Sequence, residues 1–458
     1  MKRLKTLLVF GAAVLGLVNT AFAQNGRPLT LDECVEMALR NNSQVLNAER
    51  RMHQAGTNVV TARAGILPSI NSSFSTGQFQ QGDRESKIDV PVEFDPITRE
   101  PTKYEQRNII QQGSTRNTNS LSLTAQMTVF DFGQSWNRIR QANASEEASS
   151  FSYRSTRQTT IALVHLRYFD HLKAARLLDV QQEAVKSNEE QLKRTETMYE
   201  IGSVAQGDVF RQRTVLGNSR ITLINQQNTV ANTRAGLNVV LGRPASAELA
   251  ISDVETAGDA KDYTVEEVMK VASEKNPELQ GLVKSMRAAE LGASVARVNY
   301  LPSLGARITY SRDNPLLDKV YSNFGQNYSV NLGASLSFNI FNGFLDQAEV
   351  ERQNLNYQIA QENLVDRQRN IQLEVERALL AMQAWRDITA INEENLKSAN
   401  EDLRLAQERY RVGAGTLLDI ITAQFNLTNA KATLISAKYE MMSARASLYA
   451  SMGILGAQ

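Results

Sequence analysis

The stretch TLDECVEMALRNNSQVLNAERRMHQAGTNVVTARAGILPS, residues 30–69, decides the fold of this chain because it occurs twice. It aligns without a gap on residues 264–303, and both copies end in Leu-Pro-Ser. A second block repeats 211 residues later, and its aligned pairs are Tyr199 and Tyr410, Gly202 and Gly413, Asp208 and Asp419, and Gly242 and Gly453. A duplication of this length predicts one architecture built twice. The spacings of the two blocks differ, which predicts an extra 23-residue segment between Pro68 and Phe130.

The first residues of the chain have the pattern of a secretory signal peptide. A basic start precedes a short apolar run, and Ala21-Phe22-Ala23 forms an A-x-A cleavage site. The sequence therefore predicts a signal peptide over residues 1–23, cleaved after Ala23. Cys34 is the only cysteine, so no disulfide within the chain is expected, and we interpret it as a small buried side chain. The formal net charge of +1 gives no indication of nucleic-acid binding.

Two long runs, residues 134–201 and 344–412, contain neither glycine nor proline and are rich in helix-forming residues. At a rise of about 1.5 Å per residue, each predicts a helix of roughly 100 Å. Their many charges exclude a lipid environment, so these helices need lateral support in water. Shorter helical patterns cover residues 31–64, 208–241, 265–298 and 417–452. Two of these shorter helices stacked end to end would match the length of one long helix, which suggests a tube of antiparallel helices. Helical periodicity alone also fits a coiled-coil rod.

Four segments alternate between apolar and small polar residues, as transmembrane strands do. They are residues 70–78, 120–129, 304–310 and 329–340. A soluble β-sandwich is the alternative for any single strand, but matched strands in both copies favour an outer-membrane barrel. Four strands cannot close a barrel, because the smallest known barrels have about eight. Counting alone permits a dimer, a trimer or a tetramer.

Aromatic residues gather where the second strand of each copy meets its long helix. They are Phe130, Phe132 and Trp136 in the first copy and Phe338, Phe341 and Phe344 in the second. Such positions are typical of the aromatic belt at a membrane interface, in contact with outer-membrane lipid.

Polar segments separate the strands and the copies. Residues 79–119 and 312–328 are predicted to be extracellular loops, and the extra segment of the first copy falls in the longer one. The predicted organisation is a first repeat over residues 24–242, a linker over 243–262 and a second repeat over 263–458.

Over nearly the whole mature chain, the sequence resembles the TolC family of outer-membrane efflux channels. The resemblance lies in the opening LTLDECVEMALRNN…LPS with its repeat YTVEEVMKVASEKNP…LPS, in the turns VFDFG and IFNG, and in YEIGSVAQGDV and YRVGAGTLLDI. It implies an α+β membrane protein whose four strands per chain complete a twelve-strand barrel in a homotrimer. A long α-helical tunnel in the periplasm would continue the barrel. It also implies a periplasmic adaptor and an inner-membrane pump as partners, with the channel as their passive exit duct.

The two turns that end the long helices carry the candidate functional residues. Gly202 and Gly413 stand where a left-handed helix cap is expected. By resemblance, the tips that dock the adaptor comprise Gly202, Ser203, Val204, Gly413, Ala414 and Gly415. Plain turn chemistry explains the same glycines.

By resemblance, the periplasmic gate involves Asp419 and Tyr410, and Asp208 is a further candidate because it holds the place of Asp419 in the first copy. Three copies of Asp419 around an axis would repel one another and favour cations. Thr416-x-x-Asp419 is equally a capping box, and Asp208 is equally a simple N-cap. Gly415 and Thr422 occupy positions where the family has the arginine and second aspartate of its lock, so the closure differs in detail.

No constellation in the sequence predicts an enzyme. Asp131-Phe132-Gly133 spells a kinase magnesium motif, but no nucleotide loop accompanies it. The three histidines lack a second ligand type, so neither a metal nor a cofactor is expected. The alternative function is an exported coiled-coil structural or adhesin protein.

Overall fold

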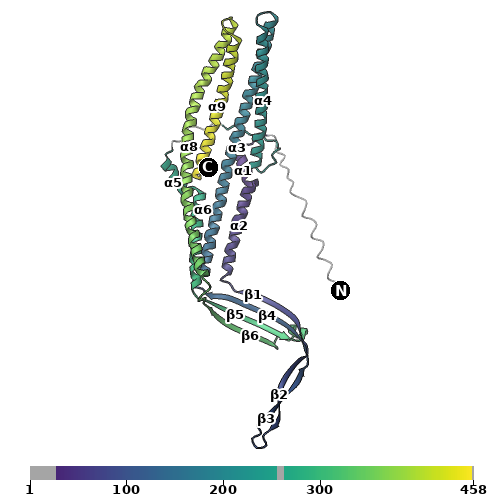
Figure 1. The fold of residues 1–458 in the computed structure, drawn as a ribbon. Coiled ribbons are helices and arrows are strands. Elements are labelled where there is room, and N and C mark those ends of the chain that lie inside the picture. Colours follow the sequence, from purple (N-terminus) through teal and green to yellow (C-terminus); the bar gives the residue numbers. More distant parts are fainter. Residues whose placement is uncertain (1–26, 255–262, 456–458) are drawn as a thin grey trace. The chain divides into compact units, whose positions relative to one another are not determined.

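The computed structural model describes residues 27–254 and 263–455 (Figure 1). The predicted signal peptide with its cleavage site, and residues 255–262 of the predicted linker, lie outside the described residues. The chain divides into two compact units. One includes residues of 27–50, 151–280 and 366–455, and the other comprises 51–150 and 281–365. Each unit therefore combines matching segments from both copies of the duplicated sequence.

The order of elements confirms that one architecture occurs twice. The first copy consists of α1 (Leu31–Asn41), α2 (Ser43–Ala64), β1 (Ser69–Gln81), β2 (Arg84–Phe94), β3 (Pro101–Gln111), β4 (Ser114–Phe130), α3 (Gln134–Glu200) and α4 (Gln206–Val240). The second consists of α5 (Val265–Lys275), α6 (Pro277–Arg297), a 3₁₀ turn (Val298–Tyr300), β5 (Ser303–Asn314), α7 (Leu317–Tyr321), β6 (Tyr328–Ser337), α8 (Leu345–Arg411) and α9 (Leu417–Met452).

The two long helices have the predicted bounds to within a residue or two. α3 and α8 each contain 67 residues, since neither run offers a glycine or proline that would end the helix earlier. In the part of the chain that the structure describes, no helix has a stretch both long and apolar enough to cross a membrane.

The shorter helices before the strands are broken, where the sequence predicted continuous helices. Asn42 separates α1 from α2, and Asn276 separates α5 from α6, both in an extended conformation. Each asparagine side chain accepts a hydrogen bond from a backbone N–H two residues later, at Gln44 or Glu278. This bond starts the second helix and competes with continuation of the first. The prediction of one helix was therefore wrong in both copies.

Each of these two asparagines also forms a hydrogen bond with the C-terminal end of a helix that returns to it, α4 for Asn42 and α9 for Asn276. We call each such contact between asparagine and helix end a joint. Asn42 donates to the carbonyl of Val240 at 2.9 Å, and Asn276 donates to that of Ser451 at 3.0 Å. Gly242 and Gly453 follow these helix ends with positive φ. The two joints are therefore built from equivalent residues.

The predicted strands form one antiparallel sheet in the order β1-β4-β5-β6. Its register places side chains of like character in rows on each face. One row combines Ile70, Ala125, Ile308 and Leu332, and a row on the opposite face combines Ser73, Ser122, Ser311 and Ser329. The sheet thus has an apolar and a polar face, as the alternation predicted. Three of the strands are longer than predicted, and the last is shorter, because β6 ends at Ser337 rather than near residue 340.

The longer predicted loop is largely strand, which corrects the prediction for residues 79–119. The β1–β4 ladder continues to the pair Gln81 and Ser114, and β2 and β3 form a separate two-stranded hairpin. Its prolines are tolerated because Pro91 adjoins a register shift and Pro101 opens β3. The extra segment of the first copy is this hairpin. In the shorter predicted loop, α7 forms one helical turn.

The hydrophobic core of the unit that includes residues 27–50, 151–280 and 366–455 lies where α1, α3, α4 and α9 meet. Cys34 is fully buried there, as predicted, and burial raises the pKa of its thiol to about 12. The hydroxyl of Tyr168 donates to the carbonyls of Ser252 and Leu29, next to an isolated parallel bridge between Leu29 and Ile251. These bonds tie the start of the first copy and the linker that follows it to the centre of α3.

Candidate functional site: the helix tips

The two tips, residues 201–205 and 412–416, have the same backbone geometry. Gly202 and Gly413 have φ near +76° and +77°, which confirms the predicted left-handed caps. The following residues Ser203 and Ala414 each donate from the backbone to a carbonyl five residues earlier, at 2.8 Å in both cases. This is the Schellman pattern, which satisfies carbonyls at a helix end. Turn chemistry therefore accounts for both glycines.

The third tip position differs between the copies for a local steric reason. A Cβ on Gly415 would lie 3.0 Å from the Cβ of Arg409 and 3.1 Å from the Tyr410 nitrogen. The second tip folds closely onto its own helix, so only glycine fits without displacing a neighbour. The first copy carries Val204 at the matching position, where it is half-buried.

Each tip presents one large apolar side chain to solvent. Ile201 is 75% exposed and Val412 is 67% exposed, and the two occupy equivalent positions in the duplication. Gly202, Ser203, Gly413 and Ala414 beside them are also exposed. The tips therefore combine a rigid backbone with accessible apolar contacts, a combination that suits a protein partner.

Asp419 is held by the capping box of α9. Its carboxylate accepts from the backbone N–H of Thr416 at 2.7 Å and from the Thr416 hydroxyl at 2.9 Å, while its own N–H donates back to that hydroxyl. The bond from the Thr416 backbone, with a smaller contribution from Arg409, holds the pKa of Asp419 below its usual range. The capping prediction is confirmed, and the carboxylate is exposed to solvent.

The other two gate residues lie near each other although they come from different copies. Tyr410 is half-buried, and its hydroxyl contacts the sulfur of Met198 on α3 at 3.6 Å. Burial, and then the charge of Asp208, raise the pKa of Tyr410. Asp208 is the third residue of α4 and pairs with Arg211 at 2.9 Å, while the N-cap position belongs to Ala205. The interpretation of Asp208 as a simple N-cap was therefore wrong.

At the positions of the expected lock, Thr422 donates its hydroxyl bond to the carbonyl of Leu418 within its own helix. Its bond therefore stays within α9 and does not reach across to Tyr410. Gly415 has no side chain that could bond to Tyr410. The structure thus gives both departures from the family pattern a local role.

The six predicted interface aromatics are exposed where the strands meet the long helices. Phe130 and Phe132 have ring centroids 4.8 Å apart, and Phe341 and Phe344 have centroids 5.4 Å apart in an edge-to-face contact. Phe132 and Phe344 both have positive φ, so each copy makes the same sharp turn from sheet to helix.

A cavity between α3, α4 and α9, lined by both polar and apolar side chains, was not predicted. It has a volume of about 500 Å³, and its polar lining includes Gln181, Asn188, Asn218, Ser219, Gln424 and Asn429. Asn188 donates to the Ser219 hydroxyl at 2.8 Å, which fixes two of these groups. The available signal was the many amides and hydroxyls within α4, where a packed helix would carry leucines.

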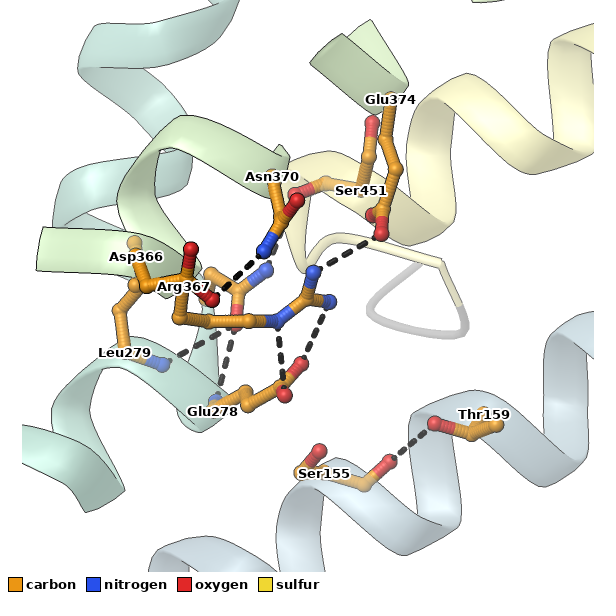
Figure 2. A network of polar contacts seen from close by, with 10 residues as sticks. Ser155, Thr159, Glu278, Leu279, Asp366, Arg367, Asn370, Glu374 and Ser451 are labelled. Carbon is orange, nitrogen blue, oxygen red and sulfur yellow. Dashed lines mark hydrogen bonds and ion pairs between the residues drawn. The ribbon is translucent and has the colours of Figure 1, made fainter. Parts of the chain in front are cut away.

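An ion-pair network at the second joint was also missed (Figure 2). Arg367 of α8 contacts both carboxylate oxygens of Glu278 at 2.8 Å, and its other nitrogen contacts Glu374 at 2.8 Å. These carboxylates raise the pKa of the guanidinium above its usual value. The first copy has Gln44 in place of Glu278, so the network belongs to the second copy alone.

A family model described as outer membrane efflux protein matches residues 34–243 and 268–454, which together form most of the chain. The chain therefore belongs to the outer membrane efflux protein family. Membership gives its broad function, efflux at the outer membrane, and overturns the alternative of a coiled-coil structural or adhesin protein.

Curated relatives agree with this assignment. The chain is 25% identical over 430 residues to a probable efflux pump outer membrane protein, TtgC, of Pseudomonas putida strain KT2440, covering 92% of this chain and 82% of the relative. It is 26% identical over 363 residues to the outer membrane protein TolC of Escherichia coli K12, covering 76% of this chain and 71% of the relative.

Solved structures share the fold. The CmeC outer membrane channel of Campylobacter jejuni superimposes with a TM-score of 0.78 at 19% identity, covering 92% of this chain and 85% of that one. The open state of the MtrE outer membrane channel of Neisseria gonorrhoeae gives a TM-score of 0.74 at 17% identity, covering 92% and 88%. The fold is thus an outer-membrane channel with four transmembrane strands per chain and a helical tunnel.

Proposed function

We propose that three copies of this chain form the exit duct of a tripartite efflux system. The duct passively conducts small molecules from a periplasmic adaptor and an inner-membrane pump to the outside. Residues 1–23 direct export and are removed after Ala23, and the mature chain catalyses no reaction. The observation that carries the proposal is the four-stranded sheet with one apolar face, joined in one chain to two helices of 67 residues.

The two edges of the sheet support assembly from several copies. β1 and β6 each pair on one side only among the described residues. In lipid, an open edge leaves backbone groups without hydrogen bonds, so the edges must meet neighbouring copies. Three copies supply twelve strands, and the mass of the detergent-purified protein tests this number. A trimer mass is expected, and a dimer or tetramer mass would contradict it.

The tips support adaptor docking and gating. Ile201 and Val412 offer exposed apolar contacts on rigid turns, and Asp419, Asp208 and Tyr410 lie just beyond them. In a trimer, three exposed Asp419 carboxylates that approach the axis would select cations at the entrance. The capping bonds to Thr416 hold each carboxylate in a fixed position for that role.

Deletion of the gene, followed by complementation, tests the function directly. We expect the deletion strain to become more sensitive to a panel of antibiotics, detergents and bile salts, and wild-type protein to restore resistance. Asp419→Ala removes the gate charge, and Glu362→Ala, which removes an exposed carboxylate of α8 outside the tips, is its matched control. Unchanged sensitivity, with a protein missing from the culture supernatant, would instead assign the duct to type I secretion.

A further inference from the structure

The short helix α7 and the residues around it fold back over the sheet. Tyr321 contacts the ring of Phe74 on β1, with centroids 5.6 Å apart, and the Tyr310 hydroxyl donates to the carbonyl of Phe324 at 3.4 Å. Val320 beneath the helix is fully buried. Residues 316–324, which we call the α7 flap, are therefore packed onto the sheet rather than extended away from it.

The strand register shows which face the flap covers. Arg312 of β5 pairs with Leu121 on β4 and with Tyr328 on β6, and Leu121 pairs with Phe74. Residues in one row of paired positions share a face. Two residues further along each strand, the same face carries Leu123, Tyr310 and Val330. The flap thus lies on the apolar face, at the strand ends far from the long helices.

Arg312 fixes the flap to that face. Its side chain is 1% exposed, and Nη2 donates to the carbonyls of Lys319, Ser322 and Asn323 at 2.7–3.2 Å. Its guanidinium also lies over the ring of Phe324, 4.7 Å from the centroid. Arginine on a lipid-facing surface costs about 2–4 kcal/mol at the midplane and about 0–1 near the interface. The flap carbonyls replace water at Nη2, and the ring of Phe324 faces the guanidinium, which reduces this cost.

The outer surface of the flap is apolar. Leu316, Leu317, Tyr321 and Phe324 are each at least half exposed. They adjoin the apolar rows of the sheet, where Val330 and Leu332 are similarly exposed. Exposed apolar area of this kind, continuous with a membrane-facing surface, is stable in lipid rather than in water.

The position of the flap along the strands matches the second boundary of a membrane. The predicted aromatic belt lies at Phe130, and Leu121 beneath the flap is nine residues earlier on β4. Nine residues at about 3.4 Å span about 30 Å along the strand. With a strand tilt of about 40°, this becomes about 23 Å along the membrane normal, close to the roughly 25 Å apolar band of such barrels.

We propose that the α7 flap is a lipid-binding element that lies in the outer-leaflet interface, with Arg312 as its tether to the barrel wall. The inference rests on the membrane placement of the sheet in the proposed function. Its ligand is the acyl region of the outer leaflet just below the headgroups. It gives the barrel a second anchor opposite the aromatic belt.

Bimane fluorescence of single-cysteine variants in lipid vesicles tests the proposal. Cys34→Ala gives a cysteine-free background, and labels are placed by Leu317→Cys on the flap, Asp318→Cys on its polar side and Leu332→Cys on β6. The full-length protein is reconstituted into vesicles of phosphatidylethanolamine and phosphatidylglycerol, with or without brominated acyl chains. We expect the brominated lipid to remove most of the fluorescence at positions 317 and 332 but little at position 318.

The label at position 332 distinguishes a failure of the flap proposal from a failure of the membrane placement of the sheet. Quenching at 332 without quenching at 317 overturns the flap proposal and leaves the membrane placement intact. Absence of quenching at both positions contradicts the placement itself. Protection of 317 from both brominated lipid and aqueous iodide identifies a second copy as the occupant and also overturns the proposal.

The tether is tested with Arg312→Gln in the 317-labelled and 332-labelled proteins. We expect the brominated lipid to lose most of its effect at position 317 while its effect at 332 stays unchanged, which also shows that the variant has folded. Arg312→Lys retains the charge but offers fewer donors, and it should give an intermediate loss at 317. Unchanged quenching at 317 in Arg312→Gln would remove Arg312 from the proposal.

Discussion

Four helices of this chain end in the same glycine turn, yet the tips and the joints place that turn in opposite surroundings. At the tips, a Cβ added to Gly202 or Gly413 would meet nothing within 4 Å. At the joints, a Cβ on Gly242 would lie 2.6 Å from the Asn41 carbonyl oxygen, and one on Gly453 would lie 2.6 Å from the Asn276 Cα. The same glycine turn thus ends the helices at the tips, where it is accessible to a partner, and at the joints, where it packs against another part of the chain.

The largest expected effect distinguishes joint glycines from tip glycines. Gly453→Ala should destabilise the protein by about 2–5 kcal/mol, because a left-handed residue costs about 1–2 kcal/mol and the clash with backbone adds about 1–3. Gly413→Ala, the control at a tip, should cost only the first of these. Thermal unfolding of the detergent-solubilised protein, followed by circular dichroism, measures both. Equal losses would show that the packing at the joint is not tight.

The joint asparagines give the next effect. Asn42→Ala and Asn276→Ala each remove one buried amide that bonds a returning helix and starts the next one, at a cost of about 1–3 kcal/mol. Because the two joints are built alike, the losses should be similar and additive in the double variant. Asn47→Ala, on the exposed face of α2, is the control and should change the unfolding temperature little.

A smaller effect is expected from the ion pair found only in the second copy. Glu278→Gln gives the second joint the side chain that the first joint carries at position 44. Arg367 keeps Glu374, and half-exposed pairs contribute little, so we expect a loss of less than about 1 kcal/mol. The loss should shrink further at high salt. A cost as large as that of Asn276→Ala would assign the joint's stability to charge rather than to the buried amide.

The smallest effect concerns the pH response of the tip. The capping bonds lower the folded-state pKa of Asp419, so their contribution is complete above the unfolded value of about 3.9 and is lost as pH falls through the lower folded value. A ring of three repelling carboxylates would instead raise the pKa. Single-channel conductance should therefore stay constant from about pH 7 to pH 4 if capping dominates.

Asp419→Asn provides the control for that titration, with Asp208→Asn as the matched variant of the other copy. A conductance change above about pH 4 that disappears in Asp419→Asn but persists in Asp208→Asn would show that mutual repulsion outweighs the cap.

The features that were predicted correctly depend on residues close together in the sequence. Helix lengths followed from the absence of glycine and proline, and the sheet faces followed from alternation. The break before Pro277 had a readable signal, since proline favours the first position of a helix. In the first copy Ser43 stands at that position, and only the joint shows why the helix stops at Asn42.

Other features depend on contacts between distant residues, which local patterns do not contain. The hairpin of β2 and β3 was obscured by its prolines, which sit at an edge and at a register shift. The contact of Tyr410 with Met198 depends on how α8 lies against α3, and the ties of Arg312 depend on where α7 folds back. The tips were located from sequence, but the partners of their side chains were not.

The unpaired edges of β1 and β6 also have a genetic consequence. In the proposed trimer each copy pairs its two edge strands with the two neighbouring copies, so one subunit with a damaged edge prevents the whole barrel from closing. If a cell makes normal and edge-damaged chains in equal amounts, only about one assembly in eight is built entirely from normal chains. Alleles that alter these two strands should therefore be dominant, whereas alleles that prevent the chain from folding should be recessive.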